Sequence, residues 1–209
     1  MDAGIEYNST KFAIGASPFF NYFSNYIYLN PTSRYDRLYG FGNQVFEYTE
    51  SEILRYGGEL HAHYEATKSL RFGFIGEYVY AEQLSGAKKG YTLPFSPPAS
   101  AIFNVKYQKP YLKSMNNAYV SLDYRLTAAQ NKIVPPEVVT DGYQVVNLSI
   151  GGDLKVNNQQ VGIALQVQNV FDANFFNHTS YYRLINVPEP GRNFIINLSI
   201  PFMGNLKHN

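Results

Sequence analysis

Apolar and polar residues alternate with a period of two along most of this chain, and the alternation constrains its fold more than any other feature. It is clearest in segment 192–202, where the residues between the apolar positions are mostly polar or small. The apolar positions are Phe194, Ile196, Leu198, Ile200 and Phe202. A period of two places alternate side chains on opposite faces of an extended chain. The segment therefore predicts a β-strand with one apolar face.

The same alternation recurs in nearly every extended segment, so the chain is predicted to be all-β. The predicted strands are residues 3–8, 12–29, 44–66, 70–82, 99–109, 117–129, 142–153, 160–170 and 191–202. Pro18 interrupts the second strand, and we expect a β-bulge there. No apolar run approaches the ~20 residues that a membrane-spanning helix requires. About nine antiparallel strands are thus expected.

The polar faces of these strands carry charged residues such as Asp123 and Arg125. Charged side chains are seldom buried in a soluble core unless they are paired. A wet interior inside a uniformly apolar exterior is the arrangement of a transmembrane β-barrel. The aromatic content of 16% suits girdles at two bilayer interfaces, where a ring is buried and a phenol stays hydrated. We therefore predict an antiparallel transmembrane β-barrel, with an aromatic-rich soluble β-protein as the alternative.

The connectors between predicted strands alternate between short and long. Outer-membrane barrels have short periplasmic turns and longer extracellular loops, so the long connectors are assigned to the cell exterior. These are residues 30–43, 83–98, 130–141 and 171–190. Closed bacterial barrels have an even number of strands, whereas nine are predicted here. We therefore expect residues 1–209 to be the C-terminal portion of a larger barrel.

Three segments near the end of the chain resemble the C-terminal signature of TonB-dependent outer-membrane receptors. They are Asn169-Val170-Phe171-Asp172, the stretch from Asn177 to Arg183, and the stretch from Val187 to Asn193 containing Pro190-Gly191-Arg192, followed by the terminal aromatic Phe202. Within that family the chain looks most like the Bacteroidetes-type receptors for metal chelates, rather than the glycan importers. The resemblance is clearest over residues 160–202.

The resemblance implies a barrel of 22 strands in the bacterial outer membrane, with an N-terminal plug in its lumen and uptake energised through TonB. Neither the plug nor the TonB box is expected within residues 1–209. The implied partners are outer-membrane lipid, the plug and N-terminal strands of the same receptor, the TonB complex and a small-molecule chelate. The chelate could be a siderophore, haem, cobalamin or another metal complex. No cofactor is implied, and the net charge of +1 gives no indication of nucleic-acid binding.

The loop 171–190 contains the candidate ligand-binding residues. Aromatic rings, an imidazole and a guanidinium suit a large anionic chelate through stacking, cation–π contact and charge-assisted hydrogen bonds. We expect at least one of His178, Tyr182 and Arg183 to contact ligand. Phe175 and Phe176 are instead expected to pack within the loops or in the outer aromatic girdle.

Two other kinds of site were weighed. His61 and His63 lie at a spacing of two beside Glu59 and Glu65, which could form a metal site. Alternate strand residues are ~7 Å apart, so we favour a role in the lumen wall and predict no metal site. A hydrolase using His61 and Asp123 is an alternative without a supporting motif, so no catalytic residue is predicted. A passive porin remains a third interpretation.

Overall fold

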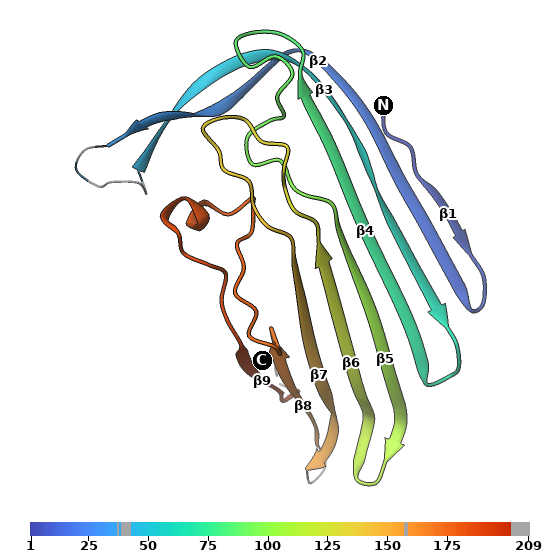
Figure 1. Cartoon of the computed structure of the whole chain (residues 1–209). Coiled ribbons are helices and arrows are strands. Elements are labelled where there is room, and N and C mark those ends of the chain that lie inside the picture. Colours follow the sequence, from blue (N-terminus) through green and yellow to red (C-terminus); the bar gives the residue numbers. More distant parts are fainter. Residues whose placement is uncertain (37, 39–42, 157–158, 202–209) are drawn as a thin grey trace, which may run out of the picture.

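The computed structural model describes residues 1–36, 38, 43–156 and 159–201. Its strands form one nine-stranded antiparallel sheet in which neighbours in sequence are neighbours in space. The strands are β1 (Ile5–Asn8), β2 (Phe12–Tyr35), β3 (Gln44–Glu65), β4 (Leu70–Gln83), β5 (Ser100–Leu112), β6 (Met115–Thr127), β7 (Tyr143–Val156), β8 (Gln159–Gln168) and β9 (Asn193–Ser199). The sheet is strongly curved (Figure 1). The predicted all-β, antiparallel fold is confirmed.

Strand register aligns the apolar positions of different strands into rows across the sheet. One row crosses eight strands, from β2 to β9. Its members are Phe12, Tyr64, Phe72, Val105, Leu122, Leu148, Val167 and Phe194. A one-residue slip would move the whole apolar set of a strand to the other side of the sheet. The predicted alternation is therefore consistent with one register, and we refer to the side carrying this row as the apolar face.

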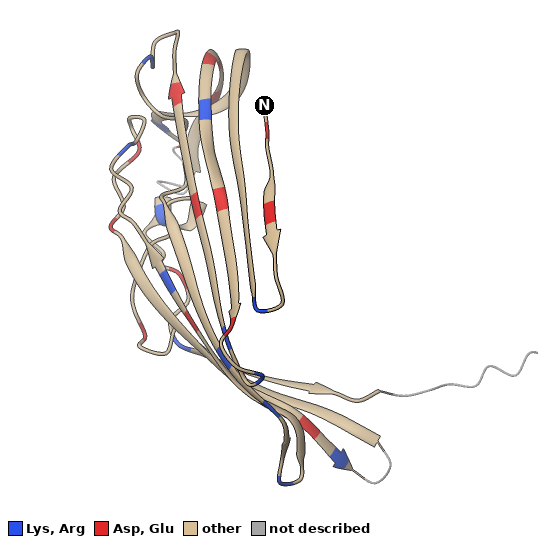
Figure 2. Ribbon diagram, turned by 90° about the vertical axis from the view of Figure 1, so that its right-hand side faces the viewer, with Lys and Arg blue, Asp and Glu red and all other residues tan. Residues whose placement is uncertain are grey.

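The other side of the sheet, the polar face, is joined by hydrogen bonds between neighbouring strands. The Asn104 side-chain amide donates to Asp123 Oδ1 at 2.7 Å and to Ser121 Oγ at 2.9 Å. Near the short turns, Arg71 pairs with Glu65 at 2.7 Å, with both side chains about half exposed. Figure 2 shows the few charged positions of the strands separated by long uncharged stretches. Such exposed pairs contribute at most about 1 kcal/mol each.

Short and long connectors alternate as predicted. The short turns are residues 9–11, 66–69, 113–114 and 157–158, of which the last pair lies outside the described residues. The long connectors are residues 36–43, 84–99, 128–142 and 169–192. Figure 1 shows the connectors 84–99, 128–142 and 169–192 gathered at one end of the sheet, here named the long-loop end, and the turns 9–11, 66–69 and 113–114 at the other, the short-turn end.

The predicted loop 30–43 was wrong over its first six residues, because β2 continues to Tyr35. Pro31 pairs with Phe46 in β3, and a register shift follows between Pro31 and Tyr35. Thr32 Oγ1 donates to the carbonyl of Val45 at 2.6 Å. Side-chain bonding and pairing with β3 thus extend the strand through a sequence rich in turn-forming residues.

The predicted bulge at Pro18 was also wrong, since Pro18 pairs in regular register with Gly58 and the nearest shift lies between Phe23 and Tyr26. The Pro18 carbonyl accepts a bond from Ala3 N–H at 3.1 Å. The nitrogen of a strand residue lies on the same side as its carbonyl. The missing Pro18 N–H therefore faces Ala3, outside β1 itself, where the pairing continues through the Ala3 bond and the bond from Phe20 N–H to the Met1 carbonyl at 2.8 Å.

Buried side chains concentrate at the long-loop end rather than within the sheet. Among the described residues, the large side chains with less than 2% exposure are Ile53, Gln83, Val134 and His178. By contrast, β9 exposes Phe194, Ile196 and Leu198 by more than 60% each. Phe202, predicted to end the last strand, lies outside the described residues. Among the described residues, no helix is long and apolar enough to cross a membrane.

Candidate functional site

Three long connectors pack together at the long-loop end and form what we name the loop cluster, residues 84–99, 128–142 and 169–192 (Figure 1). Two hydrogen bonds join the first connector to the second. Gln130 Nε2 donates to the Ser96 carbonyl at 2.8 Å, and Lys88 Nζ donates to the Pro135 carbonyl at 2.7 Å. The third connector is joined to the second by the bond from Arg183 Nη2 to Glu137 Oε1 at 2.6 Å, so all three are linked.

Asn169, with Asp172, holds together the two ends of the connector 169–192, because its side-chain amide also donates to the Pro190 carbonyl at 3.4 Å. Its backbone is left-handed, with φ of 49°, and the residue is 4% exposed. The Asn169 amide donates to the Ala173 carbonyl, and its Oδ1 accepts from Ala173 N–H, each at 2.8 Å. Nearby, Asp172 Oδ1 accepts from Arg192 N–H at 2.7 Å. Asn is the residue that best combines a left-handed backbone with local side-chain bonding.

Gly191 is required by the same closure. A Cβ on Gly191 would lie 2.6 Å from Asp172 Oδ1, closer than a real contact permits. Any larger residue would push aside the carboxylate that receives Arg192 N–H. The Asn-x-Phe-Asp and Pro-Gly-Arg elements found in the sequence are thus two halves of one loop closure.

Glu137 is the buried acceptor that joins all three connectors. Its side chain is 1% exposed, and its Oε1 accepts from Arg183 Nη2 at 2.6 Å. The same oxygen accepts from Phe95 N–H at 3.0 Å, while Oε2 accepts from Val134 N–H at 3.4 Å. Arg183 is itself 5% exposed. A buried carboxylate needs such charge-assisted bonds to offset its lost hydration.

Arg183 receives three kinds of contact at once. Besides pairing with Glu137, its Nε donates to the His178 carbonyl at 2.6 Å, and its guanidinium lies 5.0 Å from the centre of the Phe95 ring. The planar guanidinium is suited to this combination of bonding in its plane and stacking on its face. Arg183 therefore links its own connector to the connectors that carry Glu137 and Phe95.

His178 lies beneath the surface of the cluster, with 1% of its side chain exposed. Its Nδ1 lies 2.7 Å from Thr140 Oγ1, and its Nε2, which has no hydrogen-bond partner, lies 3.9 Å from Glu137 Oε1. Burial, and then the neighbouring Arg183 guanidinium, lower the pKa of His178 from its ordinary 6.5 to about 4. The ring is therefore neutral at physiological pH.

Tyr182 is the exposed member of the three predicted ligand-binding residues, with 66% exposure. It lies in a short 3-10 helix, η2 (Tyr181–Ile185), which begins after Ser180 and ends at Asn186 in a left-handed conformation. Ser180 Oγ accepts from Tyr182 N–H at 3.3 Å. The helix thus presents the Tyr182 ring to the outside while its neighbour Arg183 points inward.

Aromatic rings fill the space between the connectors and β3. Phe95 lies 4.7 Å from Tyr181 and 6.1 Å from Phe46, measured between ring centres. Phe175, expected to pack rather than bind, stacks on Tyr143 at 4.1 Å. Offset and tilted aromatic pairs of this kind add about 0.5–1.5 kcal/mol beyond the area they bury.

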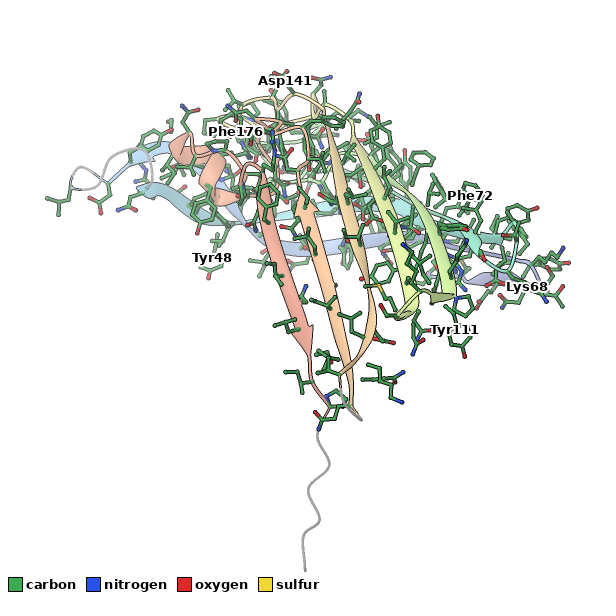
Figure 3. The ribbon with its side chains drawn as sticks, turned by 90° about the horizontal axis from the view of Figure 1, so that it is seen from below. Tyr48, Lys68, Phe72, Tyr111, Asp141 and Phe176 are labelled. Carbon is green, nitrogen blue, oxygen red and sulfur yellow. The ribbon has the colours of Figure 1, made fainter. Side chains whose placement is uncertain are left out.

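A hollow of about 340 Å³ opens between the second and third connectors of the cluster. Its lining includes Val138, Thr140, Asp141, Phe175, Phe176 and Arg183. Figure 3 labels Asp141 and Phe176 among the side chains of this end of the molecule. The volume falls within the range typical of small-molecule sites.

The histidine pair on β3 has no metal-like neighbourhood. The His61 and His63 rings are 6.4 Å apart between centres, and the His61 ring lies against Gly15, where a Cβ would be 2.3 Å from His61 Cε1. Glu65 pairs with Arg71 instead. Within the described parts of the chain, no group of three metal-binding side chains is found.

Sequence reasoning missed Glu137, Thr140 and Phe95, which contact the predicted residues from other connectors. Glu137 follows Val134-Pro135-Pro136 and precedes two valines. A single carboxylate in an apolar, proline-containing stretch is a signal that could have found it, because such a charge is seldom placed there without a partner.

The solved structures that share this fold include the following three. The copper transporter OprC matches with a TM-score of 0.75 and 23% identity, covering 92% of this chain and 29% of its own. The FrpB iron transporter from Neisseria meningitidis (F3-3 variant) matches with 0.63 and 20%, covering 93% and 30%. BauA, the ferric preacinetobactin receptor from Acinetobacter baumannii, matches with 0.68 and 15%, covering 95% and 28%. The chain therefore spans less than a third of each of these proteins.

A family model described as TonB dependent receptor-like, beta-barrel, matches residues 1–170. The match covers most of the 209 residues and includes the strands β1–β8, whose register builds the apolar face. The chain therefore belongs to the family of TonB-dependent receptor-like β-barrels.

Proposed function

We propose that residues 1–209 form the C-terminal portion of the barrel of an outer-membrane receptor that takes up a scarce metal chelate. Two observations carry this proposal. The sheet has one apolar and one polar face, and the loop cluster at one end of it is held together by hydrogen bonds and an ion pair. A wet wall would let a ligand pass, and packed outer loops would bind it first. By their names, the similar structures include transporters of copper and iron and a ferric preacinetobactin receptor.

The proposal extends to parts outside this chain. A plug and the remaining strands would complete the barrel, and a TonB contact would energise uptake. The polar face suits a movable plug, because exposed ion pairs such as Arg71 with Glu65 are individually weak and can exchange with water. The Bacteroidetes-type assignment belongs to the same proposal and rests on the C-terminal motifs.

The ligand is proposed to meet the loop cluster at Tyr182 and the hollow beside it. Tyr182 provides an exposed ring for stacking, while Phe175 and Phe176 provide apolar walls. Arg183 borders the hollow, but its Nη2 is engaged by Glu137, and His178 lies behind the wall. We therefore propose that Tyr182 contacts the ligand and that Arg183 and His178 position the loop that carries it.

The test uses the full-length receptor in cells that lack competing uptake systems. Growth on single chelates under iron restriction, with and without TonB, identifies the ligand class and the energy source. TonB-independent uptake of many unrelated small solutes would favour the porin interpretation and overturn the proposal.

The role of Tyr182 is tested in the same cells, with equal amounts of wild-type and variant receptor at the cell surface. Tyr182→Ala is expected to weaken binding of the identified chelate by about tenfold, consistent with loss of one stacking or cation–π partner. Tyr111→Ala is the matched control, because Tyr111 is 78% exposed near the short turns (Figure 3). Equal affinities for the two variants would remove Tyr182 from the site.

A further inference from the structure

One basic side chain interrupts the apolar face near the short-turn end. Lys109 follows Tyr107 by two positions on β5, so the two side chains share a face. Lys109 Nζ lies 5.8 Å from the centre of the Tyr107 ring, which belongs to a row with Val120 and Ile150. A charge facing lipid costs about 2–4 kcal/mol at the bilayer midplane and little near the interfaces. We therefore expect Lys109 to lie at a membrane–water interface, where an anionic group can pair with its ammonium.

Lys109 stands apart from the other basic residues of its neighbourhood. In the described strands β4–β9, the remaining Lys and Arg side chains lie at polar-face positions. They are Arg71, Lys106, Arg125 and Lys155. Lys106 stacks on Tyr119 at 4.8 Å on that opposite face. The ion pairs found among the described residues do not include Lys109.

A groove of about 500 Å³ lies beside Lys109 on the apolar face. Its lining is otherwise almost wholly apolar and includes Tyr107, Leu112, Met115, Val120, Ile150 and Ile196. The groove arises where the register of β6 and β7 shifts between Asn116 and Tyr119, with Asn117 at a φ of 50°. The small residues Ala118 and Gly152 lie at this shift, so the surface is hollowed there.

Met115 forms part of the groove because Gly152 has no side chain. A Cβ on Gly152 would lie 2.7 Å from both Cγ and Sδ of Met115. The flexible thioether therefore rests where a larger residue would otherwise stand. A depression floored by Met115 and Ala118 and walled by larger apolar side chains is complementary to a hydrocarbon chain.

We propose that this groove seats an acyl chain of one anionic glycerophospholipid and that the Lys109 ammonium binds its phosphate. Lys109 lies four residues from the turn 113–114, on the order of 13 Å along the strand. Its long apolar stem can follow the groove wall while the ammonium reaches the headgroup level. Exposed Tyr111 lies between Lys109 and the turn, where an amphipathic ring suits the interface. The proposal rests on the membrane embedding proposed above, but not on the identity of the chelate.

The test measures lipid binding to the purified full-length receptor in detergent by native mass spectrometry, with dioleoyl phosphatidylglycerol as the probe. One retained phosphatidylglycerol is expected, held more tightly than phosphatidylcholine of the same acyl chains. Lys109→Gln is expected to weaken it about fivefold, the effect of one basic residue at an anionic surface. Lys109→Arg should retain binding. Lys106→Gln is the matched control on the polar face and should leave binding unchanged.

Ala118→Leu tests the groove separately, since it fills the floor without altering charge, and is expected to weaken the same binding. Each variant is first checked for the heat-dependent gel migration of a folded barrel. Equal phosphatidylglycerol affinity in the wild type, Lys109→Gln and Ala118→Leu would overturn the proposal, as would preference for lipid A over phosphatidylglycerol. A receptor that is embedded and transports its chelate yet fails this test refutes only the lipid site. A chain that stays in solution without detergent refutes the embedding itself.

Discussion

Replacing Glu137 with alanine removes a carboxylate that three separate connectors share. Arg183 would lose its partner at 2.6 Å while remaining 5% exposed, and the N–H groups of Phe95 and Val134 would lose an acceptor. Removing one member of a buried ion pair costs about 3–5 kcal/mol. Each unsatisfied buried N–H adds about 1–3 kcal/mol unless water enters. We expect the loop cluster to open at least 100-fold more often, which corresponds to roughly 3 kcal/mol.

The assay is hydrogen–deuterium exchange of the full-length receptor, followed by mass spectrometry of peptides from each connector. Glu137→Ala should speed exchange in residues 84–99, 128–142 and 169–192 together, because one carboxylate joins all three. Peptides from the β5–β6 hairpin at the short-turn end should keep wild-type exchange. Glu65→Gln is the control, since Glu65 also pairs with an arginine but is about half exposed and should contribute at most about 1 kcal/mol.

A double variant distinguishes two causes of the Glu137→Ala effect, namely the loss of hydrogen bonds and the burial of an unpaired Arg183 charge. Glu137→Met combined with Arg183→Met replaces both buried charges by apolar side chains of similar length, which is often nearly neutral. It should therefore restore much of the protection that Glu137→Ala removes. Wild-type exchange in all three connectors of Glu137→Ala, or faster exchange in only one of them, would refute the shared-acceptor reasoning.

Three further perturbations probe other parts of the structure. Lowering the pH from about 6.5 to about 4 should destabilise connector 169–192 by up to roughly 3 kcal/mol. The reason is that the pKa of His178 is about 4 in the folded protein and near 6.5 when the connector opens. Hydrogen–deuterium exchange corrected for intrinsic rates measures this loss, and His178→Gln should remove the pH dependence. Asn169→Ala should destabilise the same connector by about 1–3 kcal/mol, since two bonds to Ala173 are lost, and protease nicking within it should rise while that of Asn174→Ala does not. Gly57→Val should lower the temperature of the gel-migration shift, because a Cβ there would lie 2.1 Å from the Tyr78 carbonyl oxygen; an unchanged transition would contradict the close approach of β3 and β4.

The strands were predictable because their signal is local. A period of two is a property of the extended chain itself, and lining up Val105 with Leu122 or Phe194 with Val167 needs only that every strand turn its apolar side the same way. Predictions based on residue type were wrong where pairing between strands determined the local structure. Pro31 suggested a loop, yet cross-strand pairing with Phe46 keeps it in β2. Pro18 suggested a bulge, yet it pairs in regular register with Gly58 in β3, and its carbonyl still accepts from Ala3 N–H on the other side.

The sequence predicted which connectors are long, but not which of their side chains contact one another. The sequence by itself determined that His178, Tyr182 and Arg183 lie in one long connector between two strands. Only the tertiary structure decided that Arg183 meets Glu137, 46 residues away, and that His178 meets Thr140, 38 residues away. A side chain is exposed or buried according to what the folded chain places over it. Tyr182 stays outside and its neighbour Arg183 does not, because the carboxylate that binds the guanidinium comes from another connector.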